Sequence, residues 1–187
     1  MRTSSVPLTR LGDIGSPIDP HSALKRGQDF RLSMQLSGDQ EPVLESRGFG
    51  MEKMTQPHLI EFRDILDHRG ALTPIEAEKD VPFAIRRIYY IYDVSHGAVR
   101  AGHSHKELQQ VLIALSGSFN VHLDDGYARQ TFMLNRPNIG LYVPQMTWRD
   151  IDNFSGGAVC LSLASQHYEE SDYYRDYESF IRAVGRR

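Results

Sequence analysis

The sequence predicts an all-β fold, built from short antiparallel strands arranged as a sandwich or barrel. From Pro57 onward, short runs rich in Ile, Val, Tyr and Phe alternate with turn signals, as they do in such folds. Asp125-Gly126, between two of these runs, is typical of a two-residue hairpin turn. The 187 residues show no alternation of strands with long helices and no phosphate-cradling glycine loop, which argues against a parallel α/β fold.

The expected strands are short and follow one another closely. They cover residues 59–62, 83–94, 109–115, 118–123, 129–134, 140–143 and 158–164. After the last of them, Ser171 and Asp172 can cap the start of a helix. From Tyr173 to Val184, aromatic and aliphatic residues recur at helical spacing. We therefore expect one C-terminal amphipathic α-helix that packs against the strands and closes at Gly185.

Residues 1–50 differ from the rest of the chain. They carry several prolines, scattered Ser and Gly and mixed charges, and they show no sustained hydrophobic period. We expect a disordered or loosely docked N-terminal extension over this stretch, with a natural start at Met51 or Met54 as the alternative. Residues 51–187 are long enough to bury the core of one domain.

Composition and charge exclude several classes of function. The formal net charge of −3 gives no basic field for nucleic acid or for a membrane surface. No apolar stretch approaches the roughly 20 residues that span a bilayer, and the N-terminus has no signal-peptide pattern. The single cysteine, Cys160, excludes an intrachain disulfide and lies in an apolar run, so we expect a buried, inert thiol. A cytoplasmic protein fits these features best.

The segment from Gly97 to Gly117 carries the clearest motif. His103 and His105 stand two residues apart, and residues i and i+2 of a strand project from the same face. Both imidazoles are therefore expected to point into one cavity. The spacing resembles the first motif of the cupin family, G-x5-H-x-H-x4-E-x6-G. Gln110 stands where that motif places its metal-binding Glu.

A second cupin motif supplies the third histidine ligand of a metal site, and this chain departs from it. Pro144 and Asn153 hold their places in that motif, but Arg149 occupies the histidine position. Two neutral imidazoles alone make a weak site for a catalytic metal, and a guanidinium repels a dication. We therefore expect no bound metal and no other cofactor. Proton transfer is then the natural work of His103 and His105, because imidazole titrates near neutral pH.

Other polar side chains lie near the histidines in the sequence. Arg100 and Arg149 can bind an anion or stabilise an enolate. Tyr89, Tyr90 and Tyr92 lie along one expected strand, where neighbouring residues face opposite ways, so Tyr89 and Tyr90 point to different faces. Only one set can line the cavity, and the sequence leaves open which.

Taken together, further stretches of the chain resemble the dTDP-4-keto-6-deoxy-D-glucose 3,4-ketoisomerases. The matching stretches are residues 67–72, 81–91, 100–106, 115–118, 123–126, 140–143, 153–155 and 163–165. The resemblance implies a metal-free cupin, an RmlC-like jelly roll or double-stranded β-helix, that forms a homodimer by exchanging an N-terminal strand. It also implies that the ketone of a dTDP-linked 4-keto-6-deoxyhexose moves from C4 to C3. The products would feed amino-sugar synthesis for surface glycans, such as O-antigen, or for antibiotics.

The resemblance also implies roles for individual residues. A histidine removes the C3 proton, and the oxygens of the resulting enediolate need hydrogen-bond donors. The expected site residues are His103, His105 and Tyr90 for catalysis, and Arg87, Arg100, Lys106, Gln110 and Arg149 for substrate binding. Ala101 and Gly102 stand where family members usually have Gly and an aromatic residue, a departure that bears on substrate and product stereochemistry.

Three other functions stay open. A sugar-nucleotide 3,5-epimerase-like enzyme would use similar jelly-roll walls and a histidine base. A non-catalytic sugar-binding or regulatory cupin would keep the fold without turnover. A metal-dependent dioxygenase is opposed by Gln110 and Arg149. Finding both His103 and His105 beside Arg100 in the cavity would favour an enzyme, and a histidine rotated into core packing would favour a binding protein.

Overall fold

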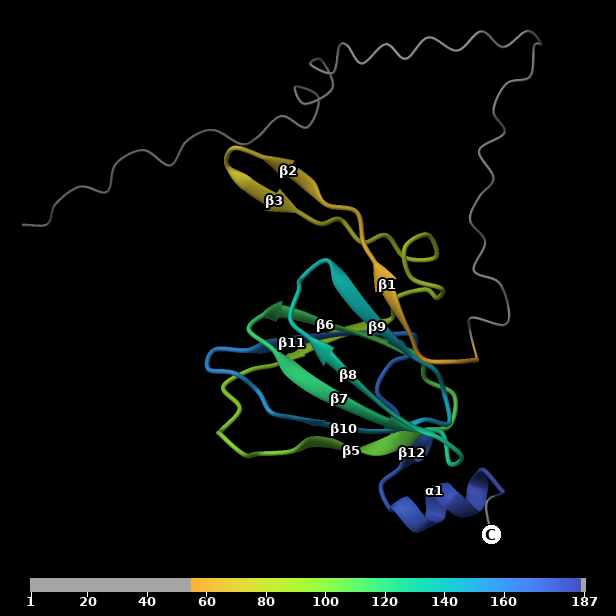
Figure 1. The fold of residues 1–187 in the computed structure, drawn as a ribbon. Helices are drawn as coiled ribbons and strands as arrows, with labels where there is room; N and C mark the ends of the chain where they lie inside the picture. The colour runs from red at the N-terminus through yellow and green to blue at the C-terminus, as the bar shows by residue number, and fades with distance from the viewer. Residues whose placement is uncertain (1–54, 186–187) are drawn as a thin grey trace, which may run out of the picture. The chain divides into compact units, whose positions relative to one another are not determined.

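The computed structural model describes residues 55–185, which fold as two facing antiparallel sheets of five strands each (Figure 1). The first sheet has the order β1 (His58–Glu61), β9 (Ile139–Val143), β6 (Gln110–Ser116), β11 (Val159–Ala164) and β4 (Arg87–Ile91). The second has the order β12 (Tyr173–Tyr174), β5 (Arg100–His105), β10 (Trp148–Asp152), β7 (Phe119–Asp124) and β8 (Arg129–Leu134). The expected all-β jelly-roll architecture is confirmed.

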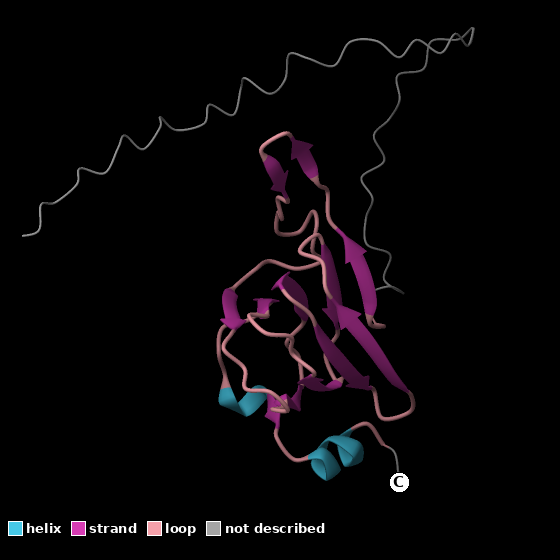
Figure 2. Cartoon of the chain, turned by 60° about the vertical axis from the view of Figure 1, so that its left-hand side comes forward, coloured by secondary structure: helices cyan, strands magenta, loops and turns pink. Residues whose placement is uncertain are grey.

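Two smaller elements complete the described chain. Strands β2 (Ile65–Asp67) and β3 (Gly70–Leu72) form a separate hairpin that projects beyond the sheets, and helix α1 (Tyr177–Ala183) follows β12 at the C-terminal end (Figures 1 and 2). No helix within residues 55–185 is long and apolar enough to cross a membrane. The expected extension over residues 1–50 lies outside the described residues.

The main core lies between the two sheets, and strand β6 shows how the sequence builds it. Leu112 and Ala114 of β6 pack into a cluster with Val121, Leu141 and other buried residues of both sheets. The alternate residues of β6 join a second cluster on the other side of the sheet; these are Val111 and Ile113, packed with Phe62, Val81, Phe83, Tyr142 and Leu163. Because each fully buried aliphatic side chain contributes about 1.5–3 kcal/mol, the first sheet is anchored on both faces.

The expected strands are confirmed, with differences at particular places. The 83–94 run forms a strand only over Arg87–Ile91. The expected two-residue turn at Asp125-Gly126 is instead a four-residue loop, because β7 pairs with β8 through Asp124 and Arg129. In that loop the Asp125 carboxylate accepts hydrogen bonds from the amides of Tyr127 and Ala128. These bonds stabilise the longer loop.

The C-terminal helix begins later than the sequence predicts. Its N-cap is Asp176, whose carboxylate accepts hydrogen bonds from Ser179, rather than Ser171 or Asp172. The residues before it form a single turn of 3-10 helix, Glu170–Asp172, and then the short strand β12. The reason is tertiary: Tyr173 and Tyr174 pair with His105 and Ser104 of β5, which removes them from the helix.

Cys160 lies in the core between the sheets, with none of its surface exposed. Burial raises the pKa of the thiol to about 12. The expectation of a buried thiol is confirmed, and at neutral pH this sulfur carries almost no thiolate, the form that reacts.

Candidate active site

A cavity of about 790 Å³ opens beside strands β4 and β5. Its walls come from β4, β5, β6 and β10, and part of its rim comes from the segment Tyr168–Arg175. The volume suits a small-molecule ligand. Four arginines line it, namely Arg87, Arg100, Arg149 and Arg175. The cavity is therefore shaped for a ligand that carries negative charge.

His103 and His105 lie on the same side of β5, as their spacing predicts. Their ring centroids are 4.9 Å apart, with the two rings nearly perpendicular. His103 lines the cavity together with Arg100. His105 is fully buried beside it and does not line the cavity. One imidazole therefore faces the cavity, and the other lies against the first.

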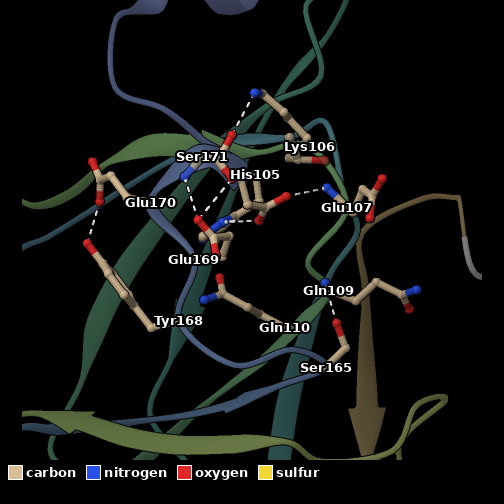
Figure 3. Close-up of polar contacts among 12 residues, drawn as sticks. His105, Lys106, Glu107, Gln109, Gln110, Ser165, Tyr168, Glu169, Glu170 and Ser171 are labelled. Atoms are coloured by element: carbon tan, nitrogen blue, oxygen red, sulfur yellow. Dashed lines mark hydrogen bonds and ion pairs between the residues drawn. The ribbon is translucent and has the colours of Figure 1, made fainter.

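His105 is not packed as an ordinary core residue, because it has a carboxylate partner. Its Nδ1 lies 2.8 Å from Oδ2 of Asp172. The other oxygen of Asp172 accepts a hydrogen bond of 2.9 Å from the amide of Glu107. The Tyr173 ring lies 4.2 Å from the His105 ring and 5.0 Å from the His103 ring, measured between centroids. These contacts fix both imidazoles, and Figure 3 shows how the 168–171 segment approaches β5.

The surroundings of the two histidines favour neutral imidazoles. Burial, and after it the charge of Arg149, lowers the pKa of His103 to about 4 and the pKa of His105 to about 2. The Asp172 carboxylate acts on His105 in the opposite direction, since a negative charge favours the protonated ring. At neutral pH His103 is therefore uncharged and can accept a proton.

A chain of hydrogen bonds connects the two positions where this sequence departs from the cupin motifs. Arg149 donates to Oε1 of Gln110 at 2.6 Å and to the carbonyl of Thr147 at 2.6 Å. The Gln110 amide then donates to the hydroxyl of Tyr89 at 2.7 Å. Since the Tyr89 oxygen accepts this bond, its own proton is free to be donated. Burial raises the pKa of Tyr89 and keeps the hydroxyl protonated.

The donor set at this position does not fit a metal ion. A cupin metal would use His103, His105, the residue at 110 and the residue at 149, but the guanidinium of Arg149 occupies the oxygen of Gln110. Nδ1 of His105 is bound to Asp172. Among residues 55–185 there is no group of three or more His, Cys, Asp or Glu side chains placed to hold a metal. The residues present are arranged for hydrogen bonding and charge rather than for coordination.

The other expected site residues lie at different distances from the cavity. Arg87 and Arg100 line it, and neither forms an ion pair with a carboxylate within the described residues. Arg87 stacks over the rings of Tyr89 and Tyr168, 5.3 and 5.5 Å from their centroids. Lys106 does not line the cavity, and its ammonium donates to the carbonyl of Ser171 (Figure 3).

The pleat of β4 determines which way each tyrosine side chain of this strand points. Tyr89 faces inward and reaches Gln110. Tyr90 faces the other way, is 61% exposed and contacts Tyr92, with ring centroids 5.6 Å apart. All three tyrosines line the cavity, so the expectation that only one set can do so is wrong.

The sequence reasoning missed the residues that the 168–175 segment contributes. Arg175 binds Glu170 through two hydrogen bonds of 2.5 and 2.7 Å and lies over the Tyr173 ring, 4.3 Å from its centroid. Asp172 and Tyr173 contact the histidines. No local sequence pattern indicates these roles, because the contact between Asp172 and His105 joins residues 67 positions apart in the sequence. The local pattern of the segment instead predicts the first turn of a helix.

The chain resembles known proteins over most of its described length. The model of the family "FdtA: WxcM-like, C-terminal" matches residues 55–185. A TDP-4-oxo-6-deoxy-α-D-glucose-3,4-oxoisomerase from Aneurinibacillus thermoaerophilus is 43% identical over 128 residues, which are 68% of this chain and 92% of the relative.

Two solved structures extend the comparison. A 3,4-ketoisomerase from Helicobacter canadensis is 47% identical with a TM-score of 0.67, over 68% of this chain and 96% of its own. A histidine-to-asparagine variant of the 3,4-ketoisomerase QdtA from Thermoanaerobacterium thermosaccharolyticum was solved with TDP-4-keto-6-deoxyglucose. It is 44% identical with a TM-score of 0.68, over 70% of this chain and 95% of its own. The family resemblance of the sequence is thereby confirmed, and the chain belongs to the FdtA family of WxcM-like C-terminal domains, whose relatives named above are sugar 3,4-ketoisomerases.

Proposed function

We propose that this protein is a TDP-sugar 3,4-ketoisomerase that converts a dTDP-linked 4-keto-6-deoxyhexose into its 3-keto isomer. One observation carries the proposal: a neutral imidazole, that of His103, lines a cavity rich in arginine in a chain of this family. Its relatives are named for this reaction. Because His105 has a carboxylate partner, its burial does not favour the alternative of a non-catalytic binding protein.

The chemistry requires one proton to move between carbons and one between oxygens. The C4 ketone acidifies the hydrogen at C3, and His103 accepts that proton to give an enediolate. His103 then returns it to C4, while the hydroxyl proton of O3 is lost and O4 gains one. Atoms and electrons balance without an oxidant or reductant. We assign to Tyr89 the role of donor to the developing charge on O4, in place of Tyr90, which the family resemblance implied for catalysis.

Arg87 and Arg100 are the residues we assign to the diphosphate of the nucleotide. Both line the cavity, and within residues 55–185 neither has a carboxylate partner, so their guanidinium groups keep their capacity to bind an anion. Arg149 and Gln110 are only 1% exposed and are bonded to each other, so their contribution is the polarisation of Tyr89. Charged and neutral donors in such a chain strengthen one another.

The test is direct conversion of a substrate. The purified protein is incubated with TDP-4-keto-6-deoxyglucose in deuterated buffer, and the ring protons are followed by NMR. We expect a 3-keto product without added cofactor, both before and after dialysis against a chelator. Deuterium at C5 with no 3-keto product would assign the chain to the epimerases instead. Turnover lost with a metal and restored by it would revive the metal-dependent alternative.

We further propose a homodimer. The hairpin β2–β3 supports it, because Ile65, Leu66 and Leu72 are 47–71% exposed there. Removing these apolar side chains from water would stabilise an interface with a second subunit. Strand β1 pairs with β9 of the same chain, so the hairpin is the described element available for exchange. Sedimentation of the wild type and of Leu66→Asp would test this, with a monomeric wild type as the contrary result. A cytoplasmic location and a role in surface-glycan synthesis stay predictions.

A further inference from the structure

The carboxylate of Asp172 is the least expected feature of the site. Asp172 is 9% exposed and His105 is fully buried, and their side chains meet at 2.8 Å. We propose that Asp172 is a positioning residue for the ketoisomerase reaction: it fixes the tautomer and the orientation of His105, and through His105 it supports His103. This inference rests on the function proposed above.

The hydrogen bonds of Asp172 determine which nitrogen of His105 carries the proton. Oδ1 accepts from the amide of Glu107 at 2.9 Å, and Oδ2 lies against Nδ1 of His105. An ionised carboxylate only accepts hydrogen bonds, so Nδ1 of a neutral His105 must bear the hydrogen. The lone pair is then left on Nε2. That atom is buried and has no hydrogen-bond partner within the described residues.

The backbone holds Asp172 in place from both sides. Its carbonyl accepts from the amide of Lys106 at 2.9 Å, and the next residues, Tyr173 and Tyr174, pair with His105 and Ser104 of β5. The Tyr173 ring packs against the His105 ring at an interplanar angle of 58°. The imidazole is thus held by a carboxylate on one nitrogen and by an adjacent aromatic ring, and it has little freedom to rotate.

The pair of His105 and Asp172 can stabilise His103 when His103 becomes positively charged. When His103 accepts the C3 proton it becomes an imidazolium next to Arg149, and this is electrostatically unfavourable. The negative charge of Asp172, bonded to the neighbouring His105, offsets part of that cost. A hydrogen-bonded His–Asp pair is a general device for holding an imidazole in one tautomer.

Asp172→Asn is the variant that tests the tautomer most sharply. An amide has one oxygen and one NH₂ group, so it cannot accept from both Glu107 and His105. If the buried backbone amide of Glu107 lost its acceptor, the cost would be about 1–3 kcal/mol. The imidazole of His105 avoids such a loss, because it can move its hydrogen from one nitrogen to the other. We therefore expect Asn to keep the bond from Glu107 and to turn its NH₂ group toward Nδ1. His105 would then carry its hydrogen on Nε2.

The readout is ¹⁵N NMR of the histidine side chains, combined with steady-state kinetics on TDP-4-keto-6-deoxyglucose. In the wild type we expect His105 to be neutral with hydrogen on Nδ1 at pH 7. In Asp172→Asn we expect the hydrogen on Nε2, a kcat lower by roughly 10²- to 10⁴-fold and a KM within a few-fold, because Asp172 does not line the cavity. The control is Glu169→Ala, which removes contacts to Ser171 in the same turn and should change neither quantity.

The tautomer decides the proposal independently of activity. Hydrogen on Nε2 in the wild type, or an unchanged tautomer in Asp172→Asn, would overturn it whatever the turnover. If Asp172→Asn does not fold, the wild-type spectrum still gives the answer. Absence of ketoisomerase turnover in the wild type would instead refute the proposed function, and the NMR result would then stand by itself.

Discussion

Burial and the charge of Arg149 make the pKa of His103 differ from that of an exposed histidine. Both disfavour the imidazolium, which lowers its pKa from 6.5 to about 4 in the folded protein. The unfolded chain binds this proton at higher pH than the folded chain does. The stability that depends on His103 is therefore complete above pH 6.5 and is lost as the pH falls from 6.5 toward 4.

The same shift predicts the pH dependence of activity. The acid limb of kcat/KM reports the free enzyme, so its midpoint should lie near pH 4 rather than near 6.5. The profile is measured between pH 3.5 and 8, with circular dichroism at each pH to confirm folding. A midpoint close to 6.5 in a folded protein would show that the base is an unperturbed group, and His103 would lose its assignment.

Gln110→Glu restores the residue of the cupin motif, and we expect it to lower turnover rather than to create a metal enzyme. A carboxylate at 110 would pair with Arg149 and would accept a hydrogen bond from the hydroxyl of Tyr89. In the wild type that hydroxyl accepts from Gln110, so its proton can be donated to substrate. A loss of roughly 10-fold or more in kcat is expected, within the range for one misdirected donor. Gln110→Met, which removes both bonds, is the matched variant. Wild-type kcat in Gln110→Glu would contradict the chain from Arg149 to Tyr89.

The sequence could predict residues whose spacing within one strand places them together. His103, His105 and the substitutions at Gln110 and Arg149 were identified in this way, and the structure brings all four positions into contact range. It could not choose between Tyr89 and Tyr90, because the pleat fixes only that they differ in direction. Asp172 was missed because its role arises from tertiary pairing with β5.

Among the structural elements, the turn between β6 and β7 depends on Gly117. Its φ is +65°, and a Cβ there would lie 2.5 Å from Oγ of Ser155 and 2.8 Å from Cα of Ala158. The left-handed conformation and the crowding act together. This glycine closes the first cupin motif, so its place in the motif has a structural cause rather than a catalytic one.

Gly117→Ala should therefore lower the free energy of unfolding by about 2–4 kcal/mol, the sum of backbone strain and overpacking. Gly97→Ala, with φ of +77° and open space around it, isolates the backbone effect and should cost about 1 kcal/mol. Gly156→Ala has neither feature and should stay within about 0.5 kcal/mol of wild type. Denaturant unfolding measures all three, and equal losses at Gly117 and Gly97 would refute the crowding argument.

Element boundaries were less predictable than element types. Strands with clear apolar runs were expected correctly, whereas β10 and β12 carry polar and aromatic residues that give no apolar run. Trp148 and Asp150 of β10 are stabilised by pairing with β7, and Tyr173 of β12 by pairing with β5. Such strands depend on neighbours that are distant in sequence, so local patterns cannot identify them.

For the whole molecule, the two facing sheets lead us to expect that the described domain folds without the N-terminal residues. Among residues 55–185, its two apolar clusters are built from residues Ile60 onward. A variant starting at Met51 should therefore melt within a few degrees of the full chain and keep its turnover within about threefold. Thermal unfolding and the NMR assay measure this. An insoluble or inactive truncation would show that residues 1–50 contribute to the core or to the site.

The central claim is that His103 carries the proton between C3 and C4. His103→Asn and wild type are each mixed with TDP-4-keto-6-deoxyglucose in D₂O, and loss of the substrate's C3 proton is followed by ¹H NMR. Lys106→Gln serves as the matched variant, since this neighbour of His105 points away from the cavity to Ser171. We expect His103→Asn to fold and bind substrate but to slow C3 proton loss and 3-keto formation together by roughly 10²-fold or more. Wild-type rates in His103→Asn would contradict the account and leave the base to be found elsewhere.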